Sequence, residues 1–192
     1  MFYEAKVKSY IRVPPHTFHE NTEQSIMKAL RDRFENFISK DLGVVIGVTS
    51  INEVGEGVII PGDGAAYYET VFTLLTFKPE LQEVVVGTVR EINEFGAFLD
   101  IGPLDGMVHI SQTMDDYVSF SKANVLTGKE SKKSLKVGDL CRARIIAVSY
   151  KDMSNPKIGL TMRQPFLGKE EWWKDENKAK KAVKEDKKKE KE

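Results

Sequence analysis

Hydrophobic and polar residues alternate at the start of the chain. From Tyr3 to Val13 the odd-numbered positions are mostly apolar, and the even-numbered positions are mostly charged or polar. A period of two residues is typical of a strand that buries one face and exposes the other. Pro14 and Pro15 follow. Because neither proline can donate a backbone hydrogen bond, the pattern predicts that the strand ends there.

The hydrophobic period then changes to that of a helix. Asn21 is a suitable N-cap, and Gln24 stands at the third helical position, where its side chain can reach back to the cap. We expect Gly43 to close the helix, because glycine is common just after a helix C-terminus. Four apolar residues at helical spacing predict the buried face: Ile26, Leu30, Phe34 and Phe37.

Two further strands are expected at residues 44–54 and 67–77. The first half therefore predicts an α+β domain over residues 1–79, with one main helix packed on a small antiparallel sheet. Between these strands, residues 55–64 combine glycine-rich turns with the apolar run Val58, Ile59 and Ile60. The run has two interpretations, a β-hairpin folded over the core or a loop inserted into a partner.

The second half predicts five short strands with turn signals between them, at residues 84–92, 95–101, 107–111, 140–148 and 157–163. In the second of these strands, Ala97, Leu99 and Ile101 share one face, which suits a core. Five such strands are the number expected of a small OB barrel. We therefore predict an all-β, five-stranded OB barrel over residues 80–165.

Two side chains in this predicted barrel point the other way. Alternation places Phe98 on the face opposite the core, and it places His109 on the outer face of the following strand. An aromatic ring and an imidazole on the outside of a sheet can stack with nucleobases. The alternative interpretation is that these side chains simply cover the rim of the barrel.

Composition limits how such a surface can bind. The formal net charge of the 192 residues is zero, which argues against a protein that holds nucleic acid by electrostatics alone. Local basic groups remain: Arg142 and Arg144 share a strand face, and four lysines precede Gly138. The lysines are either a contact surface or a solvated loop; they are Lys129, Lys132, Lys133 and Lys136.

Other functional classes find little support in the sequence. No apolar run is long enough for a membrane span, and no targeting segment is visible. The lone Cys141 suits a packing role and favours an intracellular, cytoplasmic location. His16 and His19 fall short of a metal site, and no catalytic constellation, cofactor motif or nucleotide-binding loop is present. We therefore expect a protein without a catalytic site, metal or cofactor of its own.

Several motifs resemble a known RNA-binding family. The series GTVREINEFGAFLDIG, DGMVHIS, LKVGD and IGLTM is similar to the RNA-binding domain first described in ribosomal protein S-one, over roughly residues 82–164. The resemblance implies an OB barrel whose RNA-binding face includes Phe95, Phe98 and His109, with Lys157 as a basic contact. Many such domains carry an acidic residue where this chain has Ser149.

A wider resemblance covers both halves. The segments MFYEAKVKSYIRVPP, GVTSINEVGEGVIIPGDGAAYYETVF, DDYVSF and LTGKESKKSLKVGD resemble the family that contains the E-prime subunit of archaeal RNA polymerase and the seventh subunit of eukaryotic RNA polymerase II. That resemblance implies a non-catalytic subunit that forms a heterodimeric stalk with the F subunit of the polymerase and lies near emerging single-stranded RNA. It also implies docking on the polymerase core through a tip that contains Gly62, Asp63 and Gly64. The alternative is a free-standing S-one RNA-binding factor of an exosome or translation complex.

The last segment departs from both predicted domains. Residues 166–192 end in a run composed almost entirely of lysine, acidic residues and alanine. With no apolar stripe to pack against a core, we expect a charged tail that is partly disordered. The pair Trp172 and Trp173 could anchor the start of this tail or fix it on the barrel.

Overall fold

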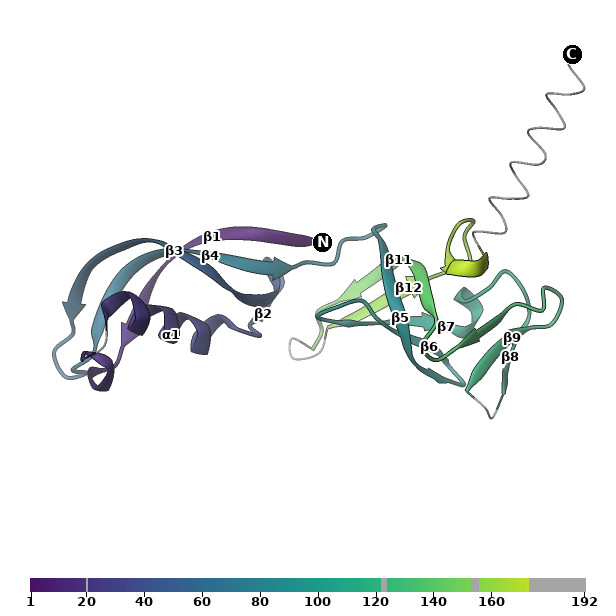
Figure 1. The fold of residues 1–192 in the computed structure, drawn as a ribbon, viewed down its shortest axis with the longest axis horizontal. Helices are drawn as coiled ribbons and strands as arrows, with labels where there is room; N and C mark the ends of the chain where they lie inside the picture. The colour runs from purple at the N-terminus through teal and green to yellow at the C-terminus, as the bar shows by residue number, and fades with distance from the viewer. Residues whose placement is uncertain (20, 122–123, 153–155, 173–192) are drawn as a thin grey trace, which may run out of the picture. The chain divides into compact units, whose positions relative to one another are not determined.

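The computed structural model describes residues 1–19, 21–121, 124–152 and 156–172, and the chain divides into two compact units, Met1–Lys78 and Pro79–Glu192. In the first unit, one face of an antiparallel sheet of order β1-β4-β3-β2 packs against helix α1 (Figure 1). The α+β prediction is confirmed. The elements are β1 (Phe2–Val13), η1 (Pro15–Thr17), α1 (Thr22–Phe34), β2 (Ile38–Ser39), β3 (Gly43–Ile59) and β4 (Ala66–Phe77).

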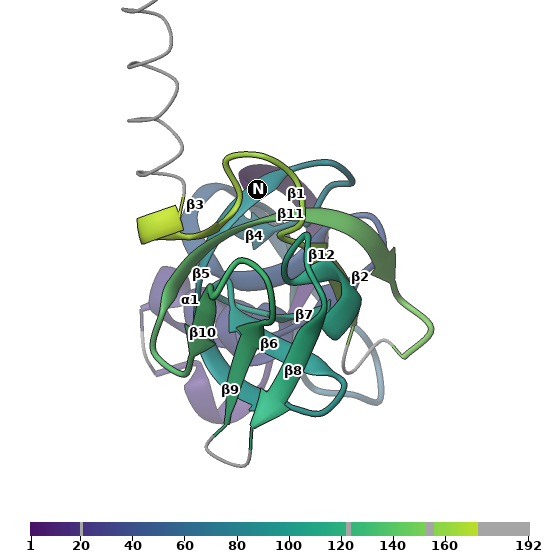
Figure 2. The ribbon, with the colours of Figure 1, turned by 90° about the vertical axis from the view of Figure 1, so that its right-hand side faces the viewer.

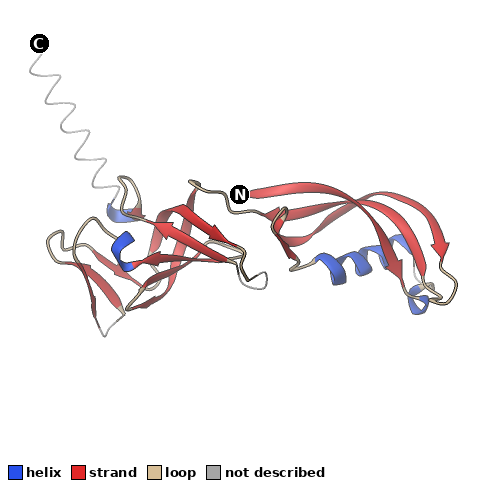
Figure 3. Ribbon diagram, turned by 180° about the vertical axis from the view of Figure 1, so that it is seen from behind, coloured by secondary structure: helices blue, strands red, loops and turns tan. Residues whose placement is uncertain are grey.

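The sequence pattern explains this packing. In β1 the apolar positions point inward and the charged positions outward, with Ile11 and Val13 almost completely buried. Asn21 caps α1 by accepting a hydrogen bond from the Glu23 N–H at 3.0 Å. From the predicted helical stripe, Ile26 and Leu30 enter the core beside Phe72 and Leu74 of β4, and Phe34 packs against its edge. Figure 3 shows the helix in blue against the red strands.

The helix ends earlier than predicted. Its last residue is Phe34, and Asn36 follows in a left-handed conformation with φ of 61°. Asn36 N–H then donates to Val45 O, and Val45 N–H donates to Phe37 O, so the chain leaves the helix to pair with β3. Gly43 begins β3 instead of closing the helix, and Phe37 is an exposed residue outside the stripe. Asparagine adopts left-handed backbone more readily than most residues other than glycine, so Asn36 can end the helix upstream of Gly43.

The glycine-rich segment extends the sheet as a hairpin. Strand β3 pairs with β4 from Val44 to Ile59, with four register shifts that bend it. The hairpin turns at residues 60–65, and Val58, Ile59 and Ile60 are 57%, 62% and 47% exposed. The run therefore belongs to a β-hairpin, but its side chains do not cover the core.

The second unit contains the predicted OB barrel. Its strands pair in the order β12-β7-β6-β5-β11, and pairing of β11 with β12 closes the ring. The interior is filled by alternate residues, among them Val89, Leu99, Val108, Ile145 and Leu160. The fold prediction is confirmed. The strands are β5 (Val84–Asn93), β6 (Gly96–Asp100), β7 (Asp105–His109), β11 (Leu140–Ser149) and β12 (Lys157–Thr161).

Three shorter strands that the sequence did not predict lie within this unit. After β7, the 3-10 helix η2 (Ile110–Gln112) leads into a small antiparallel sheet of order β10-β9-β8, visible in Figure 2. Its strands are β8 (Val118–Ser121), β9 (Val125–Gly128) and β10 (Ser134–Lys136). Leu126 of β9 and Leu135 of β10 are buried, so this small sheet is a packed insertion.

The described part of the predicted tail packs against the barrel. Strand β13 (Gly168–Lys169) pairs with β11, and Leu167 is buried beside it. Lys169 Nζ lies 3.1 Å from Asp139 Oδ1, an ion pair that is largely shielded from solvent. The charged run from residue 173 onward, on which the disorder prediction falls, lies outside the described residues. In the described parts of the chain, no helix has the length and apolar character needed to cross a bilayer.

Leu30→Ala should destabilise the first unit by about 2–5 kcal/mol, because it removes a fully buried side chain between the helix and the sheet. The change is measured from amide hydrogen exchange of α1 and β4 by NMR. Lys28→Ala, on the exposed face of the same helix, is the control and should change stability by less than about 0.5 kcal/mol. Equal effects of the two substitutions would contradict the assigned core.

Candidate RNA-binding face and docking tip

Strand register places Phe98 and His109 on one outer face of the barrel. Phe98 of β6 pairs with Met107 of β7, and Gly96 pairs with His109. Residues directly opposite one another in an antiparallel pair share a face, and so do positions two apart in one strand. Phe98, Met107 and His109 therefore lie together on the outside, while their neighbours Ala97, Leu99 and Val108 are fully buried.

The face continues onto the neighbouring strand without obstruction. Gly159 of β12 pairs with Met107, and Ala147 of β11 pairs with Gly159. These small residues leave a low surface next to the Met107 and Phe98 side chains, which are partly exposed. A flat aromatic group such as a nucleobase can lie against such a surface.

His109 is held in a fixed orientation. Its Nδ1 accepts a hydrogen bond from the Ser111 N–H at 3.3 Å and lies 2.8 Å from Ser111 Oγ. Because Nδ1 accepts, the proton of the neutral ring belongs on Nε2. The ring thus caps η2 while staying exposed, and its free edge offers a donor to a ligand.

Phe95 lies at the end of the same face. It is 59% exposed in the turn before β6, where Asn93 Oδ1 accepts hydrogen bonds from the N–H groups of Phe95 and Gly96. Phe95 O accepts from the Ile110 N–H at 2.8 Å, so the turn is tied to the residue that follows His109. The structure therefore brings Phe95, Phe98 and His109 to one region.

The predicted basic contacts lie farther away. Lys157 is exposed at the start of β12 and shares its outward face with Gly159, but β12 runs parallel to β7, so Lys157 lies toward the end opposite His109. Next to it, Asp105 pairs with Arg90, with 3.2 Å between Arg90 Nη1 and Asp105 Oδ2. Lys157 can reach a ligand that extends along β12, but it is not adjacent to the aromatic group.

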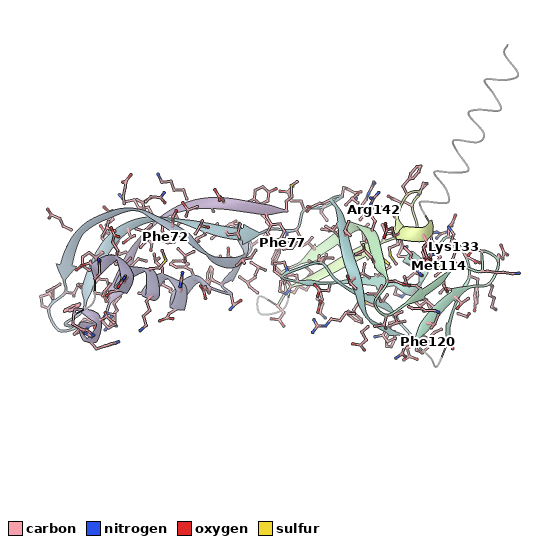
Figure 4. All side chains as sticks on the ribbon, viewed as in Figure 1. Phe72, Phe77, Met114, Phe120, Lys133 and Arg142 are labelled. Carbon is pink, nitrogen blue, oxygen red and sulfur yellow. The ribbon has the colours of Figure 1, made fainter. Side chains whose placement is uncertain are left out.

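Arg142 and Arg144 of β11 lie at different places relative to the aromatic face. Arg142 pairs with Val86 in the first half of β5, whereas β6 pairs with the second half. Arg144 pairs on its other side with Thr161 of β12, one position beyond the pair of Leu160 with Val108 of β7. Figure 4 labels Arg142 beside β11, away from the β8–β9 insertion. Among the described residues, Arg144 Nε is buried without a hydrogen-bond partner. The structure therefore separates Arg142 from Phe98 and His109, whereas Arg144 lies on the same sheet as His109 with β12 between them.

The predicted tip residues form an ordered turn in the first unit. Gly62 and Gly64 have φ of 95° and 68°, which glycine adopts readily. Between them, Asp63 accepts two hydrogen bonds from Arg12, from Nε at 2.9 Å and from Nη2 at 2.6 Å. Tyr67 Oη donates to the same carboxylate at 2.6 Å. The turn is therefore held by charge-assisted bonds from Arg12 of β1 and Tyr67 of β4.

The Asp63 contacts were missing from the sequence prediction. Arg12 and Asp63 are 51 positions apart, and Arg12 occupies an ordinary polar position of an alternating strand. No local pattern links the two residues. Only the pairing of β1 with β4, which carries Tyr67 opposite Arg12, brings them together.

The Arg12 and Tyr67 hydrogen bonds hold the pKa of Asp63 well below its usual 3.8. Since the pKa is lowered in the folded state, the stabilisation is complete above the unfolded value and is lost only as the pH falls through the folded value. We expect the Asp63 carboxyl carbon shift, followed by NMR from pH 7, to remain that of the ionised form at pH 3.

Arg12→Gln is the matched variant for this titration. Without the guanidinium, the Asp63 pKa should rise toward 3.8. A midpoint near 3.8 in the unmodified protein would contradict the described contacts.

Comparisons with protein families agree with this two-part organisation. Residues 8–64 match the SHS2 domain found in the N terminus of Rpb7p and Rpc25p, and residues 78–154 match the S1 RNA binding domain. The first match covers most of β1, helix α1, β3 and the tip and ends before β4, and the second covers most of the barrel.

Curated relatives match over most of the chain. DNA-directed RNA polymerase subunit Rpo7 of Sulfolobus acidocaldarius is 42% identical over 173 residues, which cover 90% of this chain and 94% of that protein. Rpo7 of Saccharolobus solfataricus is 40% identical, covering 90% and 97%. DNA-directed RNA polymerase III subunit RPC8 of Saccharomyces cerevisiae is 32% identical, covering 59% and 54%. The chain therefore belongs to the Rpo7 family of DNA-directed RNA polymerase subunits and carries an S-one RNA-binding domain.

Proposed function

We propose that the chain acts as a non-catalytic stalk subunit that holds emerging single-stranded RNA on its barrel during transcription. The observation that carries the proposal is the outward placement of Phe98, Met107 and His109 on one face. Aromatic and imidazole rings in this arrangement bind bases by stacking, which tolerates any base sequence.

The charges around this face point to a weak contact. Glu91 of β5 pairs with Phe98. Asp100 lies two residues beyond Phe98 on β6, and Asp105 lies two residues before Met107 on β7. These carboxylates repel phosphates, and the formal net charge of the chain is zero. Weak binding is sufficient for a subunit fixed near the RNA exit, because attachment raises the effective RNA concentration.

The tip supports a docking role for the first unit. Val58, Ile59 and Ile60 form a contiguous exposed apolar run at the end of the β3–β4 hairpin. An exposed apolar surface of this kind is typical of a protein contact. Because the Arg12 and Tyr67 bonds to Asp63 already order the turn, little conformational entropy remains to be lost on docking. We assign this surface, with Gly62 to Gly64, to the polymerase core.

Pairing with the F subunit of the polymerase completes the proposal. Membership of a polymerase subunit family favours this assembly over a free-standing exosome or translation factor. Native copurification should return the F subunit and the large polymerase subunits in fixed ratio. Recovery with exosome or ribosomal proteins instead would refute the stalk assignment.

Phe98→Ala or His109→Ala should weaken binding of a single-stranded oligouridylate by about 1–3 kcal/mol each, because each removes a stacking surface. Fluorescence anisotropy of labelled RNA at fixed salt measures the change. Tyr10→Ala removes an exposed aromatic ring from the other unit and should leave affinity unchanged. If both barrel variants bind as tightly as the unmodified chain, RNA does not contact this face.

Ile59→Asp should reduce recovery of the large polymerase subunits at least tenfold, because it places a charge in the apolar docking contact. Pairing with the F subunit and the thermal midpoint should be preserved, since Ile59 is exposed in the free chain. Ile146→Asp, an exposed apolar position on β11, is the control. Normal recovery of the core with Ile59→Asp would exclude the tip as the docking surface.

A further inference from the structure

A cavity lies at one end of the barrel, separate from the Phe98 and His109 face. It has a volume of about 520 Å³ and opens between the segment after η2, the loop before β10 and the chain that follows β12. Figure 4 labels Met114 and Lys133, two of its lining residues, close to each other. The volume is within the range of small-molecule sites and is sufficient for one nucleotide.

The cavity has an apolar floor and an aromatic wall. Met114, Met162 and Leu167 form the floor and are almost completely buried, and Trp172 lines the side. The indole lies directly over Gly168, where a Cβ atom would come within 2.5 Å of Trp172 Cε3. Gly168 also has φ of 91°. Glycine at this position is therefore what allows the ring to lie against the backbone at the cavity edge.

Charged groups at the rim favour an anionic ligand. Lys133 Nζ lies 5.5 Å from the centre of the Trp172 ring, and Arg163 lines the same cavity. Arg163 donates from Nε to Asp115 Oδ1 at 2.8 Å, so the lining carries two cations against one carboxylate. Lys132, Lys129 and Lys136 lie on the same insertion.

The lysine-bearing loop is ordered by a single carboxylate. Asp116 Oδ2 accepts hydrogen bonds from the Glu130 N–H at 3.0 Å, the Ser131 N–H at 2.9 Å and Ser131 Oγ at 2.8 Å. Its Oδ1 accepts from the Tyr117 N–H at 2.6 Å. These bonds lower the pKa of Asp116, with the Ser131 backbone bond as the largest cause. Lys133 is thus presented from a fixed loop, not from a mobile coil.

The same loop carries a second pairing of a lysine with an aromatic ring. Lys129 Nζ lies 4.3 Å from the centre of the exposed Tyr117 ring, and the Lys129 N–H donates to Tyr117 O. Alternating cations and aromatic rings along one edge are typical of surfaces that follow a single-stranded nucleic acid backbone. Simple solvation of the lysines explains neither the apolar floor nor the indole wall.

We propose that this cavity binds one nucleotide of single-stranded RNA, with the base against Trp172 and the phosphate at Lys133 and Arg163. A base that enters replaces the Lys133 ammonium over the indole, and the ammonium then meets the phosphate of that nucleotide. This exchange is favourable because stacking of a base is stronger than an exposed cation–π contact. The ligand class rests on the proposed function, whereas the site is separate from the barrel face.

The two sites lie at the same end of the barrel. Strands β7 and β12 are parallel, so His109 and the residues after Thr161 both lie at their C-terminal ends. Helix η2 connects His109 to Thr113 at the cavity, and Met162 N–H donates to Gln112 O at 2.8 Å. A strand stacked on Phe95 and His109 can therefore continue across η2 into the cavity.

Trp172 fluorescence provides a direct test in the full chain. In a Trp173→Phe background Trp172 is the remaining tryptophan, because the sequence contains two. Titration with single-stranded oligouridylate should quench its emission, with the same midpoint as anisotropy of the labelled RNA. Absence of quenching while the RNA binds would overturn the proposal.

Affinity measurements separate this site from the barrel face. Trp172→Ala should weaken RNA binding roughly 5- to 150-fold, with partial recovery in Trp172→Phe. Lys133→Gln should reduce the slope of log affinity against log salt by about 0.7, as expected for one phosphate contact on a single strand. Lys151→Gln, an exposed lysine outside the cavity, is the control and should leave affinity and slope unchanged.

The effects of the barrel-face and cavity variants on RNA affinity distinguish the two proposed sites. If Phe98→Ala weakens binding and Trp172→Ala does not, the cavity proposal fails and the proposed barrel face stands. If only Trp172→Ala and Lys133→Gln weaken binding, the cavity is supported and the barrel face is wrong. If Trp172→Ala leaves RNA affinity intact but lowers recovery of polymerase subunits, the cavity holds a peptide and the nucleotide proposal is overturned.

Discussion

Closure of the barrel through pairing of β11 with β12 is the constraint on which the second unit depends. Strand β11 pairs with β5, β12 and β13, so one strand joins the opening of the barrel, its end and the chain that follows. In a small closed barrel, side chains along each strand alternate between the interior and the exterior, and the inward-pointing set fills the interior. Once Leu99, Val108 and Leu160 fill the interior, Phe98 and His109 must lie outside.

In both units a carboxylate orders a loop to which we assign a binding role. Asp63 holds the tip through Arg12 and Tyr67, and Asp116 holds the lysine loop through the N–H groups of Glu130 and Ser131. In each case the carboxylate satisfies several donors at once, and its charge is stabilised by these bonds. A prearranged loop loses less entropy when a partner binds, which suits the weak contacts that we propose for this chain.

The architecture places different requirements on different surfaces. The barrel interior needs apolar side chains of the right volume, whereas Phe98, Met107 and Gly159 lie on the outer face and remain partly exposed. The exposed run of Val58, Ile59 and Ile60 likewise contributes nothing to the core of its own unit. The buried residues are required for folding, whereas the exposed apolar residues are the ones for which we propose binding.

The sequence alone determined the alternation of β1, the stripe of α1, the five barrel strands and the outward direction of Phe98 and His109. These features follow from local periods of two and 3.6 residues, which a linear pattern expresses directly. Tertiary structure decided the early end of the helix at Phe34, the Arg12 contact with Asp63, the separation of Arg142 from Phe98, and the cavity between Met114 and Trp172. The helix ends where the left-handed Asn36 turns the chain toward β3, and the sequence offered Gly43 as the more obvious stop. The other three features depend on residues far apart in the chain, which meet through strand register and barrel closure and leave no local signal in the sequence.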